Sequence, residues 1–228
     1  MSTQEQAASS TRERLLDAAA DLVYRDGVGI GVEAICKAAG VSKRSMYQLF
    51  GSKDELLAAS VERRAERTAG EVMPPAGSAL SPRERILYVF ARLEALAPRP
   101  AYLGCPYLAV QVELKDAEHP ASRVARRVKQ ELEAFFREQA RLAGAADPEL
   151  LGRQLILLFD GASARAGIRA DGLDSGLATT MANTLLDAAG PAAGTAGATA
   201  GGTAGPTARG AAARGAAPAK AAAPARAR

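Results

Sequence analysis

Apolar residues recur every three or four positions along most of the chain, and this spacing predicts helices. In the first such stretch, Thr11 is a suitable N-cap and Asp26-Gly27 a suitable end. The apolar stripe between them consists of Leu15, Ala18, Ala19, Leu22 and Val23. Proline and glycine fall between such stretches, and no run alternates as a strand would. We therefore predict an all-α fold.

Eight further helices follow from the same reading. Pro82, Pro120 and Pro148 each stand where a first-turn proline is tolerated. A proline- and glycine-rich break at 73–78 marks a domain boundary. The predicted helices are 11–25, 32–39, 42–50, 52–72, 82–97, 104–117, 120–144, 148–168 and 174–188.

The chain divides into four predicted parts. Residues 1–10 are a flexible N-terminus, and 11–57 form a first helical domain whose fourth helix continues to about residue 72. Residues 74–189 form a second helical domain. The stretch 190–228 contains no apolar residue larger than alanine, so it cannot bury enough surface to offset its ordering entropy, and we expect a disordered tail.

The formal charge of +4 belongs to that tail. The tail holds five basic residues and no acidic one, and removing these five from the 29 basic residues leaves 24 against 25 acidic. The basic tail could contact DNA phosphates without sequence preference, or it could be a solvated extension. The charge of the whole chain is therefore a poor guide to the folded part.

Several classes of protein are excluded by composition. Two cysteines and one histidine supply neither a disulfide framework, nor a zinc site, nor a Ser-His-Asp triad. No apolar stretch is long enough to span a membrane, and the polar N-terminus shows no secretory signal. We expect a cytoplasmic protein that is not an enzyme and has no cofactor or metal site.

The segment 32–53 carries the functional signal. Two helices of about eight residues, joined by a tight turn at Gly40-Val41, match the geometry of a helix-turn-helix. Cys36 is read as a small buried residue and not as a redox group. The positions expected to pack the two helices together are Ile35, Ala39, Val41, Met46 and Leu49.

Charge is sorted within this segment. Four cations and no anion lie between Glu33 and Asp54, although residues 1–67 as a whole are neutral. The cations are Lys37, Lys43, Arg44 and Lys53. A basic face on a helix-turn-helix indicates DNA binding.

Residues 11–57 resemble the N-terminal domain of the TetR family of regulators. The resemblance rests on RERLLDAAADLVYRDG, on the run AGVSK, and on Tyr47, Phe50, Lys53, Glu55 and Leu56. It implies that 41–50 holds the recognition helix, that Tyr47 and Lys53 contact phosphate, and that Phe50 is a core residue. The DNA-binding residues predicted from the charges and the resemblance are Lys37, Ser42, Lys43, Arg44, Ser45, Tyr47, Gln48 and Lys53.

Two positions depart from the family pattern. Gly31 stands where Ser or Thr usually caps the second helix and touches phosphate, so that contact is expected to be missing. Leu49 stands where His is common, which removes a polar contact there.

The resemblance also implies a homodimer that joins through the last two helices, here 148–169 and 173–188. The first of these is apolar nearly all round, as a helix buried on several sides is. A core within one chain is the alternative reading. Dimerisation would let two recognition helices read two half-sites about one turn of DNA apart.

A small-molecule effector is implied as well, and aromatic residues gather where its pocket is expected. The predicted pocket residues are Tyr88, Phe90, Tyr102, Cys105 and Tyr107. The aromatic residues could equally be plain core, and Cys105 a thiol sensor. His119 is expected to be a cap or a surface residue. The charged run that includes Arg123, Arg127 and Lys129 is expected to be a solvated face.

The sequence therefore predicts a DNA-binding transcriptional regulator, a repressor that binds a near-palindromic operator as a homodimer and is released by an unidentified small molecule. Two alternatives remain open at this point. One is an architectural, nucleoid-associated protein that uses the basic tail. The other is a helical enzyme, for which the sequence shows no catalytic constellation.

Overall fold

Side-chain caps mark where several helices begin. The Ser42 hydroxyl accepts a hydrogen bond from the Ser45 N–H at 3.0 Å, and Ser52 accepts one from Glu55 at 3.1 Å. Ser81 and Glu84 bond each other's backbone in a capping box. Prolines occupy the first turn of the helices that begin at residues 82, 120 and 148, as predicted. The side-chain caps fix these boundaries because they satisfy N–H groups that the helix itself leaves unpaired, and a proline in the first turn has no N–H that needs a partner.

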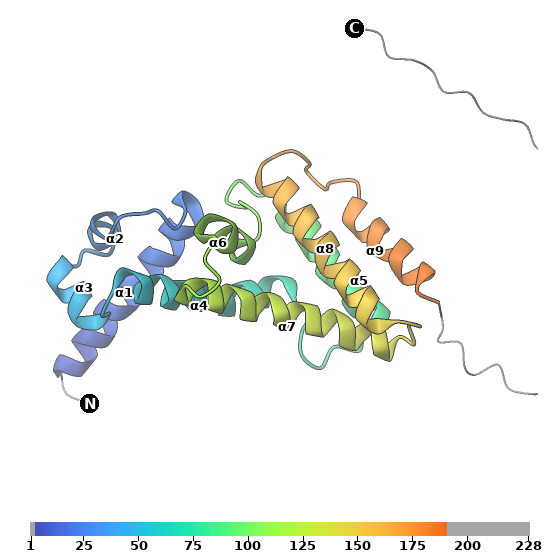
Figure 1. The fold of residues 1–228 in the computed structure, drawn as a ribbon, viewed down its shortest axis with the longest axis horizontal. Coiled ribbons are helices and arrows are strands. Elements are labelled where there is room, and N and C mark those ends of the chain that lie inside the picture. The colour runs from blue at the N-terminus through green and yellow to red at the C-terminus, as the bar shows by residue number, and fades with distance from the viewer. Residues whose placement is uncertain (1–2, 191–228) are drawn as a thin grey trace, which may run out of the picture. The chain divides into compact units, whose positions relative to one another are not determined.

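The computed structural model describes residues 3–190, and that part of the chain consists of helices and their connections, without a strand (Figure 1). The all-α prediction is confirmed. The helices are α1 Thr3–Asp26, α2 Val32–Ala39, α3 Lys43–Leu49, α4 Lys53–Val72, α5 Pro82–Leu96, α6 Pro106–Leu114, α7 Pro120–Leu142, α8 Pro148–Gly167 and α9 Leu177–Ala188.

Three predicted boundaries differ from the structure by three residues or more. α1 begins at Thr3, so Thr11 lies inside the helix and does not cap it. α6 was expected over 104–117 but ends at Leu114, because Lys115 adopts the left-handed conformation (φ 52°) that closes a helix. α9 was expected from residue 174 but begins at Leu177, after Gly176 in the left-handed region.

The buried side chains form three clusters. The N-terminal core lies among α1, α2, α3 and the start of α4 and includes Leu15, Ile35, Met46, Phe50 and Leu56. The C-terminal core lies mainly among α5, α7, α8 and α9 and includes Phe90, Leu93, Phe136, Leu155 and Ala182. The bridging core joins α1 and α4 to α6 and α7 and consists of Val23, Leu57, Val61, Tyr107, Val110, Ala121 and Ala125.

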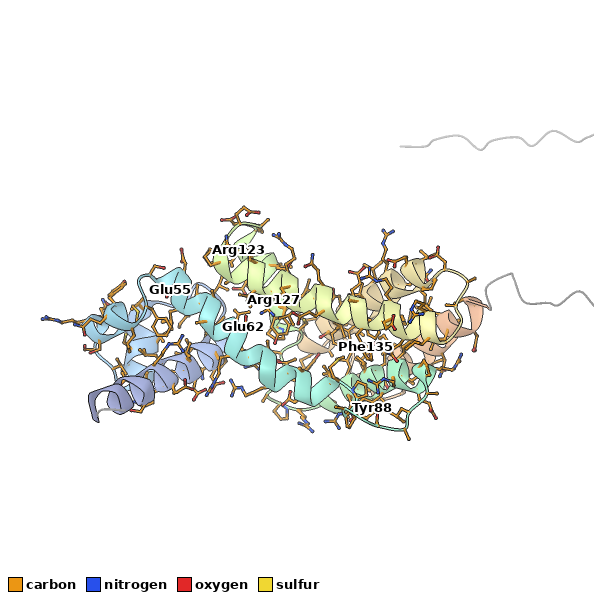
Figure 2. The ribbon with its side chains drawn as sticks, turned by 90° about the horizontal axis from the view of Figure 1, so that it is seen from below. Glu55, Glu62, Tyr88, Arg123, Arg127 and Phe135 are labelled. Atoms are coloured by element: carbon orange, nitrogen blue, oxygen red, sulfur yellow. The ribbon has the colours of Figure 1, made fainter. Side chains whose placement is uncertain are left out.

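Two long helices connect these regions. In Figure 1, α4 leads from the group α1–α3 toward α5, and α7 runs beside α4 and packs on α6 and α8 as well. Glu62 of α4 forms an ion pair with Arg127 of α7, and Figure 2 labels both residues where the helices run together. Arg127 also reaches Glu131 at 2.9 Å. A displacement of α4 or α7 would therefore shift residues at both the N-terminal and the C-terminal core.

Within residues 3–190, no helix is both long enough and apolar enough to cross a membrane. In the same part of the chain, no three His, Cys, Asp or Glu side chains lie close enough together to hold a metal ion. The predicted disordered tail, 190–228, lies outside the described residues apart from Gly190.

Candidate functional site

The turn between α2 and α3 is fixed by a glycine. Gly40 adopts the left-handed conformation (φ 64°, ψ 39°), which side chains with a Cβ disfavour. Its N–H donates to the Lys37 carbonyl at 3.2 Å, and the Val41 N–H donates to the Cys36 carbonyl at 2.9 Å. This pair of bonds is the Schellman motif, which ends α2 and starts the chain on its way into α3.

The short helix α3 has two chemically different faces. Met46, and Phe50 directly after the helix, are buried, with 0% and 1% of their surface exposed. Leu49 is half-buried against the N-terminal core. Arg44, Tyr47 and Gln48 point the other way and are exposed; Tyr47, a large aromatic residue, is 52% exposed. Their spacing of three and four residues places these side chains on one side of the helix. Such a face is suited to contact with a groove of DNA.

The cations of this region differ in their partners. Lys43 forms an ion pair with the exposed Glu33 of α2, and this contact raises the pKa of Lys43 and lowers the pKa of Glu33. Lys37 and Arg44 are exposed, and neither forms an ion pair with another described residue. Lys43 would have to leave Glu33 to bind phosphate. The unoccupied cationic surface is therefore centred on Lys37 and Arg44.

The remaining predicted contact residues partly serve the fold. Ser42 caps α3, and its hydroxyl lies 2.9 Å from that of Ser45. The Lys53 ammonium donates to the Val28 carbonyl at 3.1 Å, which ties the first turn of α4 to the loop after α1. Lys53 is therefore a less clear phosphate ligand than Tyr47.

Three structural interpretations of this segment are confirmed, whereas the loss of a phosphate contact at Gly31 and of a polar contact at Leu49 stays a prediction. Gly31 is the N-cap of α2 and supplies no side-chain hydrogen bond. Phe50 is a core residue, with the Arg12 guanidinium 5.1 Å from its ring centroid. Cys36 is buried within the N-terminal core.

A cavity of about 220 Å³ lies farther along the chain, where α4, α7 and α8 meet the loop before α6. Tyr102, Cys105 and Tyr107 line it, as the sequence suggests. Tyr88 and Phe90 do not. Phe90 is fully buried and stacks on Phe136 with 5.6 Å between the ring centroids, so it belongs to the C-terminal core. Tyr88, labelled on α5 in Figure 2, is half-buried outside the lining.

Sequence reasoning missed other residues of the lining. Tyr24 of α1, together with Arg64 and Thr68 of α4, contributes to the wall. The prediction that Lys129 lies on a solvated face is wrong: its side chain is only 11% exposed, forms an ion pair with Asp160 of α8 and lines the cavity. Arg64 and Thr68 share a face of α4 through their spacing of four residues. No sequence signal brings them together with Tyr24 and Lys129, which lie in other helices.

Four polar contacts attach the loop before α6, α6 itself and the start of α7 to α1, the loop after α1 and the start of α4. The Tyr24 hydroxyl accepts a hydrogen bond from the Leu103 N–H at 2.8 Å and donates to the Gly104 carbonyl at 3.1 Å. The Val28 N–H donates to a Glu113 carboxylate oxygen at 2.8 Å. His119 caps α7 through its Nδ1 atom, so the prediction of a cap is confirmed. Its Nε2 atom lies 3.3 Å from the Asp54 carboxylate.

Burial governs the chemistry of Cys105. Removal from water raises the pKa of its thiol, and the nearby Lys129 offsets only part of that rise. A thiol whose pKa is raised stays protonated at pH values where an ordinary cysteine begins to ionise. The thiolate is the reactive form, so the structure does not favour the sensor interpretation.

We therefore expect iodoacetamide at about pH 8 to modify Cys105 at least about tenfold more slowly in the native protein than in the unfolded chain. Mass spectrometry of the cysteine-containing peptides measures both rates. Burial also raises the pKa of Cys36, which should be protected in the same way. Rapid native modification of Cys105 would restore the sensor hypothesis.

A second apolar feature lies on the outer side of α8 and α9. An open groove of about 590 Å³ runs between these helices. Leu157 is 72% exposed there, and Met181 and Leu177 are 48% and 41% exposed. Gly161 and Ala162 line the groove between the larger side chains. Large apolar side chains gathered on one exposed face mark a surface for association.

Comparisons with known proteins agree with this geometry. The family model for bacterial regulatory proteins of the tetR family matches residues 15–60. A crystal structure of a tetR transcriptional regulator from Streptomyces avermitilis is 66% identical, with a TM-score of 0.76, and the match covers 78% of this chain and 97% of that one. A TetR-family regulator from Streptomyces coelicolor is 25% identical, with a TM-score of 0.73, over 79% of this chain and 96% of that one.

A curated relative agrees over a shorter region. An HTH-type transcriptional regulator from Mycobacterium tuberculosis is 40% identical over 76 residues, which make up 33% of this chain and 38% of that protein. The matched part thus spans less than half the length of that relative. The structure from Streptomyces avermitilis, in contrast, matches over nearly its whole length, and the chain belongs to the TetR family of DNA-binding transcriptional regulators.

Proposed function

We propose that the protein is a homodimeric repressor that binds a near-palindromic operator through α3 of each protomer and leaves it when a small molecule occupies the cavity. The observation that carries the proposal is the division of α3. Met46 and Phe50 anchor the helix, while Arg44, Tyr47 and Gln48 remain exposed on one side. Arg and Gln are side chains that form paired hydrogen bonds with guanine and adenine in the major groove.

The groove on α8 and α9 supports the dimer. In a two-fold dimer each protomer presents the same surface, so the exposed Leu157 and Met181 of one chain can fill the groove of the other. The small residues Gly161 and Ala162 would let the helices approach closely. A dimer of this kind fixes the distance between its two α3 helices, and this distance selects the spacing of the half-sites.

The cavity supports release by a ligand. Its wall includes Tyr24 of α1 and Arg64 of α4, and both helices contribute to the N-terminal and bridging cores. A ligand releases DNA only if it binds more tightly to the arrangement of helices that does not fit the operator. Because its contacts would include α1 and α4 directly, such a difference in affinity has a physical basis.

The DNA-binding assignment is tested by selecting operators from random DNA with the full chain and then measuring variants on the selected site. Arg44→Ala and Gln48→Ala should change sequence preference, each with a loss of about 1–3 kcal/mol at the base pair contacted. Tyr47→Ala and Lys37→Ala should weaken binding to all sequences. Lys37→Ala should also reduce the slope of log affinity against log salt by about one.

Two controls make this test selective. Arg99→Ala removes an exposed cation from the loop after α5 and should leave affinity unchanged. A chain cut after residue 189 should keep its sequence preference. If the four α3 and α2 variants bind as the unmodified protein does, the recognition surface is assigned wrongly; if the shortened chain loses all preference, the architectural alternative is favoured.

A further inference from the structure

Two buried hydrogen-bond donors, on side chains that line the cavity, lack acceptors. The Tyr107 side chain is 3% exposed, and its hydroxyl has no hydrogen-bond partner within the described part of the chain. The Nε–H of Arg64 is buried and unpartnered as well. Thr68 lies near the Tyr107 hydroxyl, but the pair falls outside hydrogen-bonding geometry. Buried polar groups in folded proteins are nearly always satisfied, so two unsatisfied donors at one cavity call for an acceptor from outside.

The charge of Arg64 also lacks a close partner. Its nearest carboxylate is that of Asp21, at 3.9 Å, and this carboxylate is 67% exposed and lies nearer to Arg67, at 3.4 Å. The Arg64 side chain is only 22% exposed and its guanidinium lies 3.6 Å from the centroid of the Tyr24 ring. Lys129, the other cation in the wall, is already paired with Asp160. Arg64 is thus a largely buried positive charge without a buried counterion.

The rest of the lining is mostly apolar. Tyr102 and Ser163 satisfy each other through hydroxyls 2.6 Å apart. The two carboxylates of the wall, Glu71 and Glu131, belong to exposed residues. The apolar part of the wall includes Val72, Leu93, Leu96, Val128, Leu132 and Phe159. A volume of about 220 Å³ corresponds to roughly seven water molecules at about 30 Å³ each, which suits a compact organic molecule.

We propose that the cavity binds a small aromatic or aliphatic carboxylate. The carboxylate accepts hydrogen bonds from the Arg64 Nε–H and the Tyr107 hydroxyl, and the hydrocarbon part lies against the apolar wall. A carboxylate offers several acceptor sites and a negative charge, so one group satisfies both donors and the guanidinium. The proposed ligand class is argued from the cavity alone, whereas the effect of the ligand on DNA binding rests on the function proposed above.

Through Arg64, such a ligand can affect α1 and the loop before α6. The guanidinium lies on the ring of Tyr24, and the Tyr24 hydroxyl holds the Leu103–Gly104 segment through two hydrogen bonds. A carboxylate that draws the Arg64 guanidinium toward itself changes the contact between the guanidinium and the Tyr24 ring. The position of α1 relative to the loop before α6 then depends on whether the cavity is occupied.

The test uses the full chain without DNA and three probes of nearly equal shape: benzoate, benzamide and benzylamine. Calorimetric titration measures their binding. Benzoate should bind at least about tenfold more tightly than benzamide, because only benzoate supplies a charge to Arg64, and benzylamine should bind most weakly. Equal binding of the three probes, a preference for benzylamine, or no saturable binding of benzoate, phenylacetate and hexanoate would overturn the proposal.

Two variants locate the carboxylate. Tyr107→Phe should weaken benzoate binding about tenfold while leaving the thermal midpoint of the free protein unchanged or higher, because it removes a donor that is unsatisfied there. Arg64→Met should weaken benzoate binding at least about thirtyfold and change benzamide binding less than about threefold. Tyr88→Phe, on α5 outside the lining, is the matched control and should change neither affinity.

Tyr107→Phe also separates the proposal from a purely structural role for the hydroxyl. A lower thermal midpoint combined with unchanged benzoate affinity would show that the hydroxyl serves the fold, and the proposal would fail. The DNA step is measured separately, by adding benzoate to the protein–operator complex. Benzoate that binds the protein without changing operator affinity would leave the ligand class standing and contradict release by this ligand.

Discussion

Replacement of Leu157 by aspartate is expected to convert the protein to monomers and to abolish high-affinity operator binding. Leu157 is 72% exposed on the groove of α8 and α9, so the change costs the isolated chain little. In the proposed two-fold dimer the substitution buries two unpaired charges, one from each protomer. At about 3 kcal/mol each, they would raise the dissociation constant of the dimer roughly 10⁴-fold.

Sedimentation equilibrium measures the mass, and operator titration measures the loss of affinity. Leu142→Asp is the matched control: Leu142 is 52% exposed at the end of α7 and does not line the groove. It should leave the protein dimeric and bound to its operator. If the Leu157→Asp protein stays dimeric, the interface does not lie on the groove of α8 and α9.

The second large effect is expected at Gly167, the last residue of α8. A Cβ atom at this position would lie 2.6 Å from the Leu103 carbonyl oxygen and 2.7 Å from the Gly104 nitrogen. Both neighbours are backbone atoms, so the chain itself must move. Gly167→Ala should therefore cost about 2 kcal/mol of folding free energy, as overpacking of a close contact does. For a chain of this size the thermal midpoint should fall by about 4–8 °C.

Gly167→Ala should also disturb the hydrogen bonds between Tyr24 and the loop before α6. The displaced backbone is the Leu103–Gly104 segment that Tyr24 holds, so Gly167→Ala should weaken binding in the cavity as well as lower stability. Gly70→Ala is the control. Gly70 lies in α4 with nothing within 4 Å of an added Cβ, and alanine there should stabilise the helix by up to about 1 kcal/mol. Equal thermal midpoints for the two variants would contradict the close approach of α8 to the loop.

The recognition segment could be predicted from sequence because its signals are local. Gly40, Ser42 and the apolar spacing within α2 and within α3 act on residues that are five or fewer positions apart. The pairing of Lys43 with Glu33 could not be read in the same way, because the two residues are ten positions apart and belong to different helices. Charge counted along the chain therefore overstated the unpaired cations of this face.

The cavity shows where sequence reasoning ends. Its polar residues come from α1, α4, α6, α7, α8 and the loop before α6, and no short window of sequence contains two of these helices. The aromatic cluster pointed to the right loop but also included Phe90, which packs on Phe136 in the C-terminal core. Thr11 shows the opposite error, since a good capping residue lies in the interior of a longer helix.

The bridging core has a consequence for exchanging modules between relatives. Val23 belongs to α1, and Leu57 and Val61 belong to α4, yet they pack against Tyr107, Val110 and Ala125. A chimera that joins the first four helices of this chain to the rest of another regulator would place those side chains against foreign partners. A boundary for recombining operator specificity with ligand specificity therefore cannot be chosen by position along the chain alone. The side chains that the two parts contribute to the bridging core must also be matched to each other.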